Sequence, residues 1–92
     1  MKLSELLTDA SRWTKNHYAI DTEGRPVQSR SPQAARWCLS GAICRCYSTQ
    51  DERLTAEEAL REAAGTLDIV AWNDAFERTF ADVRALIERA GV

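Results

Sequence analysis

The sequence predicts a mainly α-helical fold: one domain over residues 1–92, built as a compact bundle of four main helices with a short helical turn around Trp72. Apolar residues recur at the spacing of an amphipathic helix in four separate segments. Glycine and proline, which interrupt helices, number only four and two. The connecting segments are too short to separate two domains, and we find no internal repeat.

Composition excludes several classes of protein. The chain has 45% apolar and 28% charged residues and a net charge of −2, which is too apolar and too nearly neutral for a disordered protein. Its longest apolar run is far shorter than a membrane span. Acidic residues stand where a secretory signal needs an apolar block. We therefore expect a cytoplasmic protein with no membrane partner.

The nearly neutral charge is the sum of two unlike halves. Residues 1–50 carry seven basic and four acidic groups, a net charge of +3, whereas residues 51–92 carry five and ten, a net charge of −5. Two interpretations stay open: the halves pair with each other inside the chain, or the protein associates with itself head to tail.

An amphipathic helix is predicted for residues 2–17, because apolar side chains fall on one stripe there. These residues are Leu3, Leu6, Leu7, Ala10 and Trp13. The periodicity then stops. Two short extended pieces, Tyr18–Ile20 and Pro26–Gln28, flank the turn-forming residues 21–24 and predict a small two-stranded ribbon within residues 18–30. Such a ribbon needs to lie against the helices to be stable.

The second helix is predicted to begin with Ser31 as N-cap and Pro32 at its first position, and to run to about Tyr47. Apolar residues cover two of its sides, so we place it at the centre of the bundle. Gly41 in its interior costs about 1 kcal/mol relative to alanine. We therefore expect a backbone or an indole ring to approach closely at Gly41.

A polar loop, residues 48–53, is expected before the third helix. Thr55 and Glu58 have the spacing of a capping box, and Gly65 is expected to end the helix.

Two further helical segments are predicted near the C-terminus. Asp68 is expected to cap a single turn that carries Trp72 inward. Thr79 and Asp82 then open the last helix, which Gly91 ends.

Three cysteines, Cys38, Cys44 and Cys46, cannot all pair within one chain, so we interpret them as free thiols. Together with His17 they number the four ligands of a structural zinc site, but Cys44 and Cys46 point apart on a helix. A Cys38–His17 nucleophile pair is conceivable, although a buried thiol is inert. We therefore expect no metal, no cofactor and no catalytic residues.

Four arginines, Arg25, Arg30, Arg36 and Arg45, accompany Trp37 and could form a basic patch for nucleic acid. The overall charge is negative, and no predicted helix carries the run of basic and amide side chains that DNA contacts need. The simpler interpretation is that these arginines are solvated or pair with the acidic half of the chain. We do not expect nucleic acid as a partner.

The tripeptide formed by Trp72, Asn73 and Asp74 allows two interpretations. In the structural one, Asn73 and Asp74 satisfy backbone groups at a turn while Trp72 fills the core. In the functional one, the two polar side chains face Arg36 or Arg78 at the rim of a pocket. The structural interpretation is favoured.

Three segments stand out in chain order: DTEGRPV (residues 21–27), RWCLSGAI (residues 36–43) and AWNDAFERTFADV (residues 71–83). Together they resemble a family of small bacterial and phage domains of unknown function. The resemblance covers nearly the whole chain. It implies a framework made of Trp37, Cys38, Gly41, Ala42, Trp72, Asn73 and Asp74, and it implies no activity. The additional Cys44 and Cys46 depart from the family pattern.

Three hypotheses about function follow. The leading one is a non-enzymatic protein-interaction or regulatory module, for which Trp37 and Cys44, if exposed together, form the first candidate contact patch. The second is a small-ligand-binding or hydrolytic domain that uses a polar pocket. The third is a DNA-binding regulator. The candidate binding residues across these hypotheses are Arg36, Trp37, Trp72, Asn73, Asp74 and Arg78.

Overall fold

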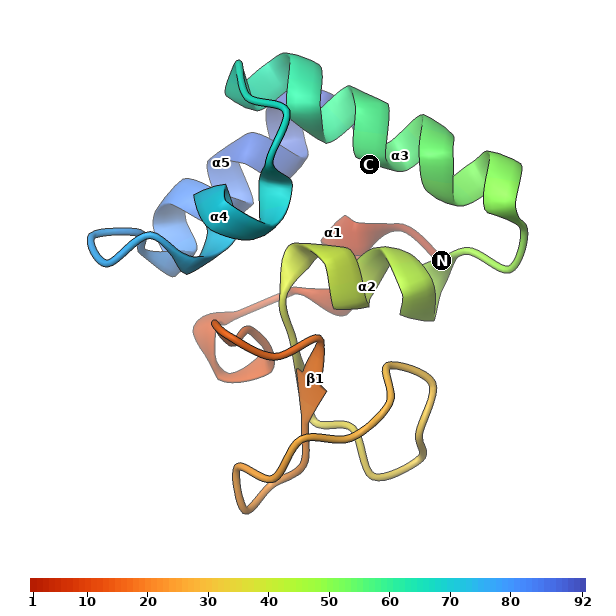
Figure 1. The fold of residues 1–92 in the computed structure, drawn as a ribbon, viewed down its shortest axis with the longest axis vertical. Coiled ribbons are helices and arrows are strands. Elements are labelled where there is room, and N and C mark those ends of the chain that lie inside the picture. The colour runs from red at the N-terminus through yellow and green to blue at the C-terminus, as the bar shows by residue number, and fades with distance from the viewer.

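The structure is a computed structural model that describes residues 1–92. Five α-helices and a single 3₁₀ turn form most of it (Figure 1). In chain order the elements are α1 (Leu3–Leu6), the 3₁₀ turn η1 (Ala10–Arg12), β1 (Ala19–Ile20), β2 (Arg36–Trp37), α2 (Leu39–Cys46), α3 (Gln50–Ala64), α4 (Ile69–Asp74) and α5 (Phe80–Ala90). The predicted mainly α-helical class is confirmed, with five helices of which α1 and α4, the one around Trp72, are short.

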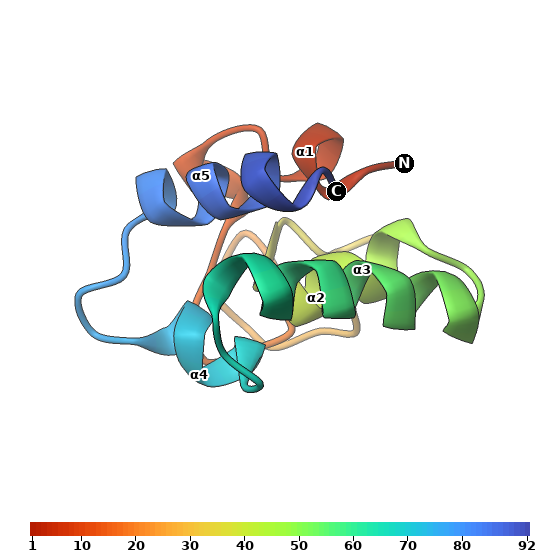
Figure 2. The same ribbon diagram turned by 90° about the horizontal axis from the view of Figure 1, so that it is seen from above.

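Helix α2 lies at the centre, in contact with α1, α3 and α4, as predicted for the second helix of the chain. Seen from above, α1 and α5 lie on one side of α2, and α4 lies on the other (Figure 2). The two chain ends meet, because the Ser4 N–H donates to the Val92 carbonyl over 3.3 Å. The core between these elements is aliphatic apart from Trp37, and its most buried leucines are Leu3, Leu7, Leu39, Leu60 and Leu86.

The predicted helix over residues 2–17 is wrong in its length. Helix α1 ends at Leu6, and the chain turns before η1 begins. The Asp9 carboxylate accepts a hydrogen bond from the Ser11 backbone N–H over 2.9 Å and caps this 3₁₀ turn. A short polar side chain thus offers the backbone an alternative to the helix. Leu3, Leu6 and Leu7 are nevertheless buried, so the apolar stripe correctly marks the core-facing side chains.

The ribbon is present, but its main pairing differs from the prediction. Strand β1 pairs antiparallel with β2, with Ala19 opposite Trp37 and Ile20 opposite Arg36. Within residues 18–30 there is only one isolated bridge, between Ile20 and Pro26. The partner strand therefore comes from the segment that the sequence assigned to the second helix.

Helix α2 correspondingly begins at Leu39 rather than near Pro32. Ser31 does start a turn, in which its hydroxyl accepts from the Gln33 N–H over 3.1 Å, but the turn does not continue into a helix. The N-cap of α2 is instead Cys38, whose sulfur accepts from the Gly41 N–H over 3.3 Å.

Gly41 lies where another backbone crosses α2. A Cβ atom at this position would lie 1.8 Å from the carbonyl oxygen of Tyr18, far inside van der Waals contact. The same oxygen accepts a hydrogen bond from the Cys38 N–H over 3.3 Å. The predicted close approach at Gly41 is confirmed, and it fixes the ribbon against the start of α2.

Helix α3 begins earlier than predicted, with Thr49 as N-cap and Glu52 completing the capping box. Residues predicted to be a polar loop therefore form its first turn. Inside the helix the Thr55 hydroxyl donates to the Asp51 carbonyl over 2.9 Å. The end of α3 at Gly65, with a φ of 68°, is as predicted.

The C-terminal helices agree with the caps read from the sequence. Asp68 caps α4 by accepting from the Ala71 N–H over 2.9 Å. Thr79 and Asp82 form the capping box of α5, and Gly91 ends that helix with a φ of 73°. These positions were predictable because a cap depends on residues only three positions apart.

Candidate functional site

Asn73 is a buried polar clamp between distant parts of the chain. Its side-chain oxygen accepts from the Trp13 indole N–H over 2.8 Å and from the Leu39 backbone N–H over 3.1 Å. Its amide nitrogen donates to the Thr14 carbonyl over 3.1 Å and to the Asp74 carboxylate over 2.9 Å. These four bonds use two acceptor and two donor positions, which is the full capacity of an asparagine side chain. With an exposure of 1%, Asn73 has no group left for a ligand.

Asp74 completes this junction. Its Oδ1 atom accepts from the backbone N–H of Asn16, over 2.9 Å, as well as from Asn73. Asn16 has a φ of 70°, a left-handed conformation that asparagine tolerates better than most residues. The carboxylate therefore holds the bend that leads from Trp13 into β1.

The two arginines predicted to face Asp74 lie elsewhere. Arg78 donates to the Trp72 carbonyl over 2.7 Å, and its guanidinium stacks 3.7 Å above the centre of the Trp72 ring. Arg36 is exposed on β2. Neither forms an ion pair with Asp74. The structure thus does not assemble Arg36, Asn73, Asp74 and Arg78 into one site.

Trp37 belongs to the core, with 2% of its surface exposed. Its indole N–H donates to the Ser29 carbonyl over 2.9 Å. The guanidinium groups of Arg12 and Arg45 lie 5.5 Å and 5.3 Å from the centre of its ring. Cys44 is exposed, but Trp37 is not, so the two do not form the contact patch considered from the sequence.

All three cysteines are free, as predicted. Burial raises the pKa of the Cys38 thiol, and it also raises the pKa of the half-buried Cys46 thiol. Cys38 and His17 line the same pocket of about 330 Å³, together with Asp74, but no hydrogen bond joins the thiol to the imidazole. The raised pKa of Cys38 keeps its sulfur in the protonated, poorly nucleophilic form. We find no group of three or more side chains placed to hold a metal ion.

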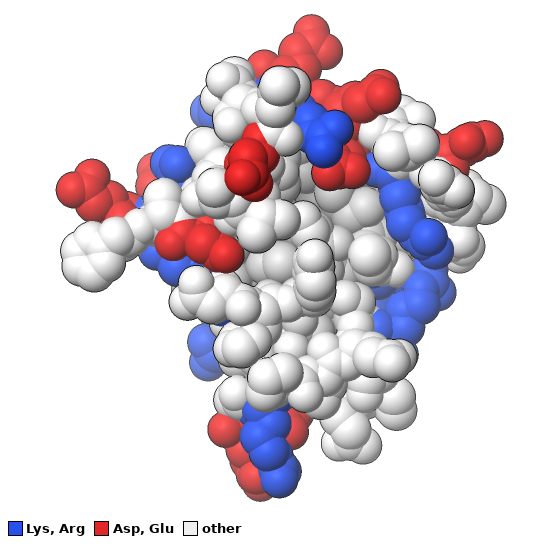
Figure 3. Space-filling model, in the orientation of Figure 1, with Lys and Arg blue, Asp and Glu red and all other residues white.

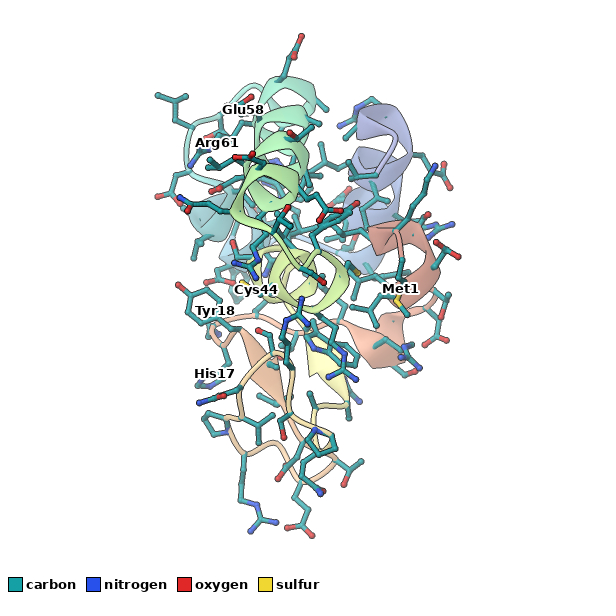
Figure 4. The ribbon with its side chains drawn as sticks, turned by 90° about the vertical axis from the view of Figure 1, so that its right-hand side faces the viewer. Met1, His17, Tyr18, Cys44, Glu58 and Arg61 are labelled. Carbon is teal, nitrogen blue, oxygen red and sulfur yellow. The ribbon has the colours of Figure 1, made fainter.

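The largest concave feature is an open groove of about 900 Å³ next to this pocket. Its floor comes from α2, one wall from the loop of residues 26–30, and the other wall from α3. Tyr18 and Val70 stand at its edge and are 61% and 43% exposed. The centre of the same face carries uncharged side chains (Figure 3). Tyr18 and Cys44 lie on one side of the molecule, from the ribbon segment and α2 respectively (Figure 4).

The two arginines of the groove have no acidic partner, whereas its one glutamate is already paired. Arg30 donates to the carbonyls of Cys44 and Tyr47, over 3.0 Å and 2.8 Å, and Arg53 donates to the Tyr47 carbonyl over 3.1 Å. Neither arginine forms an ion pair. The one carboxylate on the groove wall, that of Glu57, is paired with Arg61 on α3 over 2.8 Å. One end of the groove is therefore positively charged.

A family model described as a family of unknown function (DUF6197) matches residues 2–91. The chain belongs to this family. No curated protein and no solved structure gives a match to it. The DUF6197 match spans every helix and strand of the structure, and it assigns no activity. None of the helices is long and apolar enough to cross a membrane.

The groove of this DUF6197 domain was not among the sequence-based candidates. It gathers side chains from four separate segments, and those from residues 18–30 follow no helical period. The sequence gives only a weak indication of this groove, namely that apolar residues such as Tyr18 and Val70 lie outside every predicted core stripe. Such unassigned apolar residues mark candidates for an exposed surface.

The charge halves of the DUF6197 domain are not joined by ion pairs. Every ion pair links residues at most four positions apart, as in the pairs of Arg25 with Asp21 and Glu23. Of the two interpretations left open, the pairing of the halves with each other through ion pairs is therefore wrong. Arg30 and Arg45 bind backbone carbonyls instead of acidic side chains, and these two of the four predicted basic residues fasten the loop of residues 26–35 to α2.

Proposed function

We propose that this DUF6197 domain is a non-enzymatic protein-binding module that holds a short segment of another protein in the groove. The observation that carries the proposal is the groove itself, where the exposed side chains of Tyr18 and Val70 adjoin Val27 and Ile43. Contiguous exposed apolar surface with a polar rim is typical of an interaction site. Tyrosine is enriched at such sites because it has an apolar ring and a polar tip.

The shape favours a peptide segment over a small metabolite. The groove has about 900 Å³ of space and is open to solvent, whereas small-molecule sites enclose most of their ligand. Its polar groups do not converge on one point: Ser40 lies on the floor, Arg53 at one end and Gln28 on the loop wall. An extended segment can place successive side chains along such a surface.

The chemistry available around the groove also favours binding. Cys44 lies on the floor as an exposed thiol, with no histidine among the groove residues to activate it. Asn73, the most buried polar side chain nearby, is fully engaged in holding the fold.

The proposal is tested by selecting binders from a random peptide library displayed on phage, using the immobilised domain. Selected peptides are then measured by fluorescence anisotropy against Tyr18→Ala/Val70→Ser and against the control Leu67→Ser. Leu67 is 85% exposed and lies outside the groove, so the control removes apolar surface that is more accessible than Tyr18 or Val70 but lies elsewhere. We expect the groove variant to weaken binding at least about tenfold and the control to leave it unchanged.

A second readout uses the groove's own thiol. A bound peptide is expected to slow the alkylation of Cys44 by iodoacetamide, measured by mass spectrometry, because Cys44 lies on the groove floor. Failure to enrich any peptide, or peptides that bind equally to the groove variant and leave Cys44 unprotected, would overturn the proposal.

A further inference from the structure

The two arginines of the groove share one hydrogen-bond acceptor. Arg30 and Arg53 both donate to the carbonyl oxygen of Tyr47, over 2.8 Å and 3.1 Å. Their guanidinium groups are therefore held beside each other, although like charges repel. Arg45 fastens the same loop through the carbonyls of Ser29 and Ser31. Blue side chains accordingly line the edge of the face on which α2 ends and α3 begins (Figure 3).

This positive charge is only partly compensated within the protein. The carbonyls at the end of α2 provide about half a negative charge through the helix dipole, against two full positive charges. No carboxylate lies within ion-pair distance of Arg30 or Arg53, and Glu57 is engaged by Arg61. Each of the two guanidinium groups also keeps its Nη1 atom free of any hydrogen bond to the protein.

From this arrangement we infer that the segment bound in the groove is acidic, with a large apolar side chain against Tyr18 and Val70 and one or two carboxylates against Arg30 and Arg53. The inference rests on the proposed function. A carboxylate suits this end because it accepts paired hydrogen bonds from guanidinium groups. The apolar and positive ends together fix the direction in which the segment lies.

A protein segment fits the surroundings better than a nucleic acid. A polyanion longer than the groove would meet the acidic side chains of α3, which include Glu57, Glu58 and Glu62. Red side chains gather beyond the groove at the top of the face in Figure 3. Two arginines with one neighbouring glutamate also provide few phosphate contacts, and the net charge of the chain is −2.

The test compares three synthetic peptide pools that share a central tryptophan or leucine and differ only in the flanking positions, which are glutamate, glutamine or lysine. Fluorescence anisotropy measures their binding to the wild type, to Arg53→Gln and to the control Arg89→Gln. Arg89 is exposed in the last turn of α5, away from the groove. Circular dichroism verifies that Arg53→Gln keeps its helix content, and Arg30→Gln is the second variant if it does not.

We expect the glutamate pool to bind wild type and Arg89→Gln about tenfold more tightly than the glutamine pool, as two partly exposed charge pairs allow. Arg53→Gln is expected to reduce this preference to about threefold, because one of the two charge pairs is lost. The ratio between the two pools is compared because a shift of the groove wall weakens both pools alike. Added salt is expected to weaken only the glutamate pool.

If all three pools bind equally, or if the lysine pool binds most tightly, the inference is overturned and the proposed function still stands. If no pool binds, the result counts against the proposed function itself. Tighter binding of a single-stranded oligothymidylate than of the glutamate pool identifies nucleic acid and overturns the inference. Self-association that Phe76→Ser abolishes also overturns it, because Phe76 is 98% exposed beside Glu77 and a second copy of the chain would then be the occupant.

Discussion

Replacing Asn73 by alanine is expected to remove a large part of the stability of this domain. The change leaves the Leu39 N–H and the Trp13 indole N–H without their acceptor, and the Thr14 carbonyl without its donor. The Leu39 N–H is buried at the start of α2, where water does not replace the lost bond. At about 1–3 kcal/mol for each buried group left unpaired, with the other two partly accessible, we expect a loss of about 3–5 kcal/mol. Domains of this kind have only about 5–15 kcal/mol in total.

The assay is urea unfolding followed by far-ultraviolet circular dichroism, with tryptophan fluorescence as a second probe because Trp13 loses its partner. Gln33→Ala is the matched control, since Gln33 is an exposed amide whose side chain makes no hydrogen bond to the protein. Asn73→Asp tests the donor side separately: its carboxylate would face the Thr14 carbonyl and the Asp74 carboxylate, both acceptors. A loss below about 1 kcal/mol for Asn73→Ala would refute the clamp, because one ordinary exposed hydrogen bond accounts for that much.

Three further predictions concern backbone packing, thiol reactivity and acid stability. Gly41→Ala is expected to lower the free energy of unfolding by at least about 2 kcal/mol despite alanine's better helix propensity, because its Cβ would lie 1.8 Å from the Tyr18 carbonyl oxygen; a rise in the urea midpoint would contradict this. Cys44 is expected to be alkylated first in the native protein, since burial shields Cys38 and raises its pKa; mass spectrometry showing Cys38 modified at least as fast would contradict it. The hydrogen bond from the Thr79 backbone N–H lowers the pKa of Asp82 from its ordinary 3.8, so its stabilising effect is present above that pH and is lost as the pH falls below it. Replacing Asp82 by asparagine is then expected to reduce the acid sensitivity of the urea midpoint, and an unchanged pH profile would count against it.

Sequence reasoning located the caps of the two C-terminal helices, but not those of the second and third long segments, where neither Ser31 nor the Thr55–Glu58 pair caps a helix. The caps at Asp68 and Thr79 and the helix ends at Gly65 and Gly91 were all located correctly. Each is decided by hydrogen bonds within a few residues, and no distant part of the chain competes for those groups.

It failed where distant segments compete for the same residues. The apolar spacing through Trp37 is compatible with a helix, yet Trp37 lies in a strand because its backbone pairs with Ala19 and its indole donates to Ser29. In the same way the bend after Leu7 is reinforced by Asn73 and Asp74, which hold residues 13–16 from about 60 positions away. Tertiary hydrogen bonds of this kind override helix propensity, which is a weak preference per residue.

For the same reason, the sequence predicted the framework around Trp72 and Asn73 but not the groove. Rare residues such as Trp72 and Asn73 stood out, and Asn73 became a structural clamp, as the structural interpretation favoured. The groove also holds scarce residue types, at Tyr18, Pro26 and Cys44, but no motif joins them in the sequence. The groove exists only because Arg30 and Arg45 fasten the loop of residues 26–30 to α2.

Those arginines connect the fold to the proposed binding. Arg30 and Arg53 each donate to carbonyls near the end of α2 and still keep their positive charge and one terminal nitrogen free for a partner. A single guanidinium has five N–H groups, so it can hold a loop and bind a carboxylate at the same time. Removing either arginine therefore perturbs both the groove wall and its charge. Lysine at position 53 separates the two effects, because it keeps the charge but cannot reproduce the paired bonds to the Tyr47 and Ser48 carbonyls in the same planar geometry. If charge alone selects the partner, the Arg53→Lys variant is less stable but still prefers the glutamate pool. If the variant loses the preference as well as stability, Arg53 acts by shaping the end of the groove.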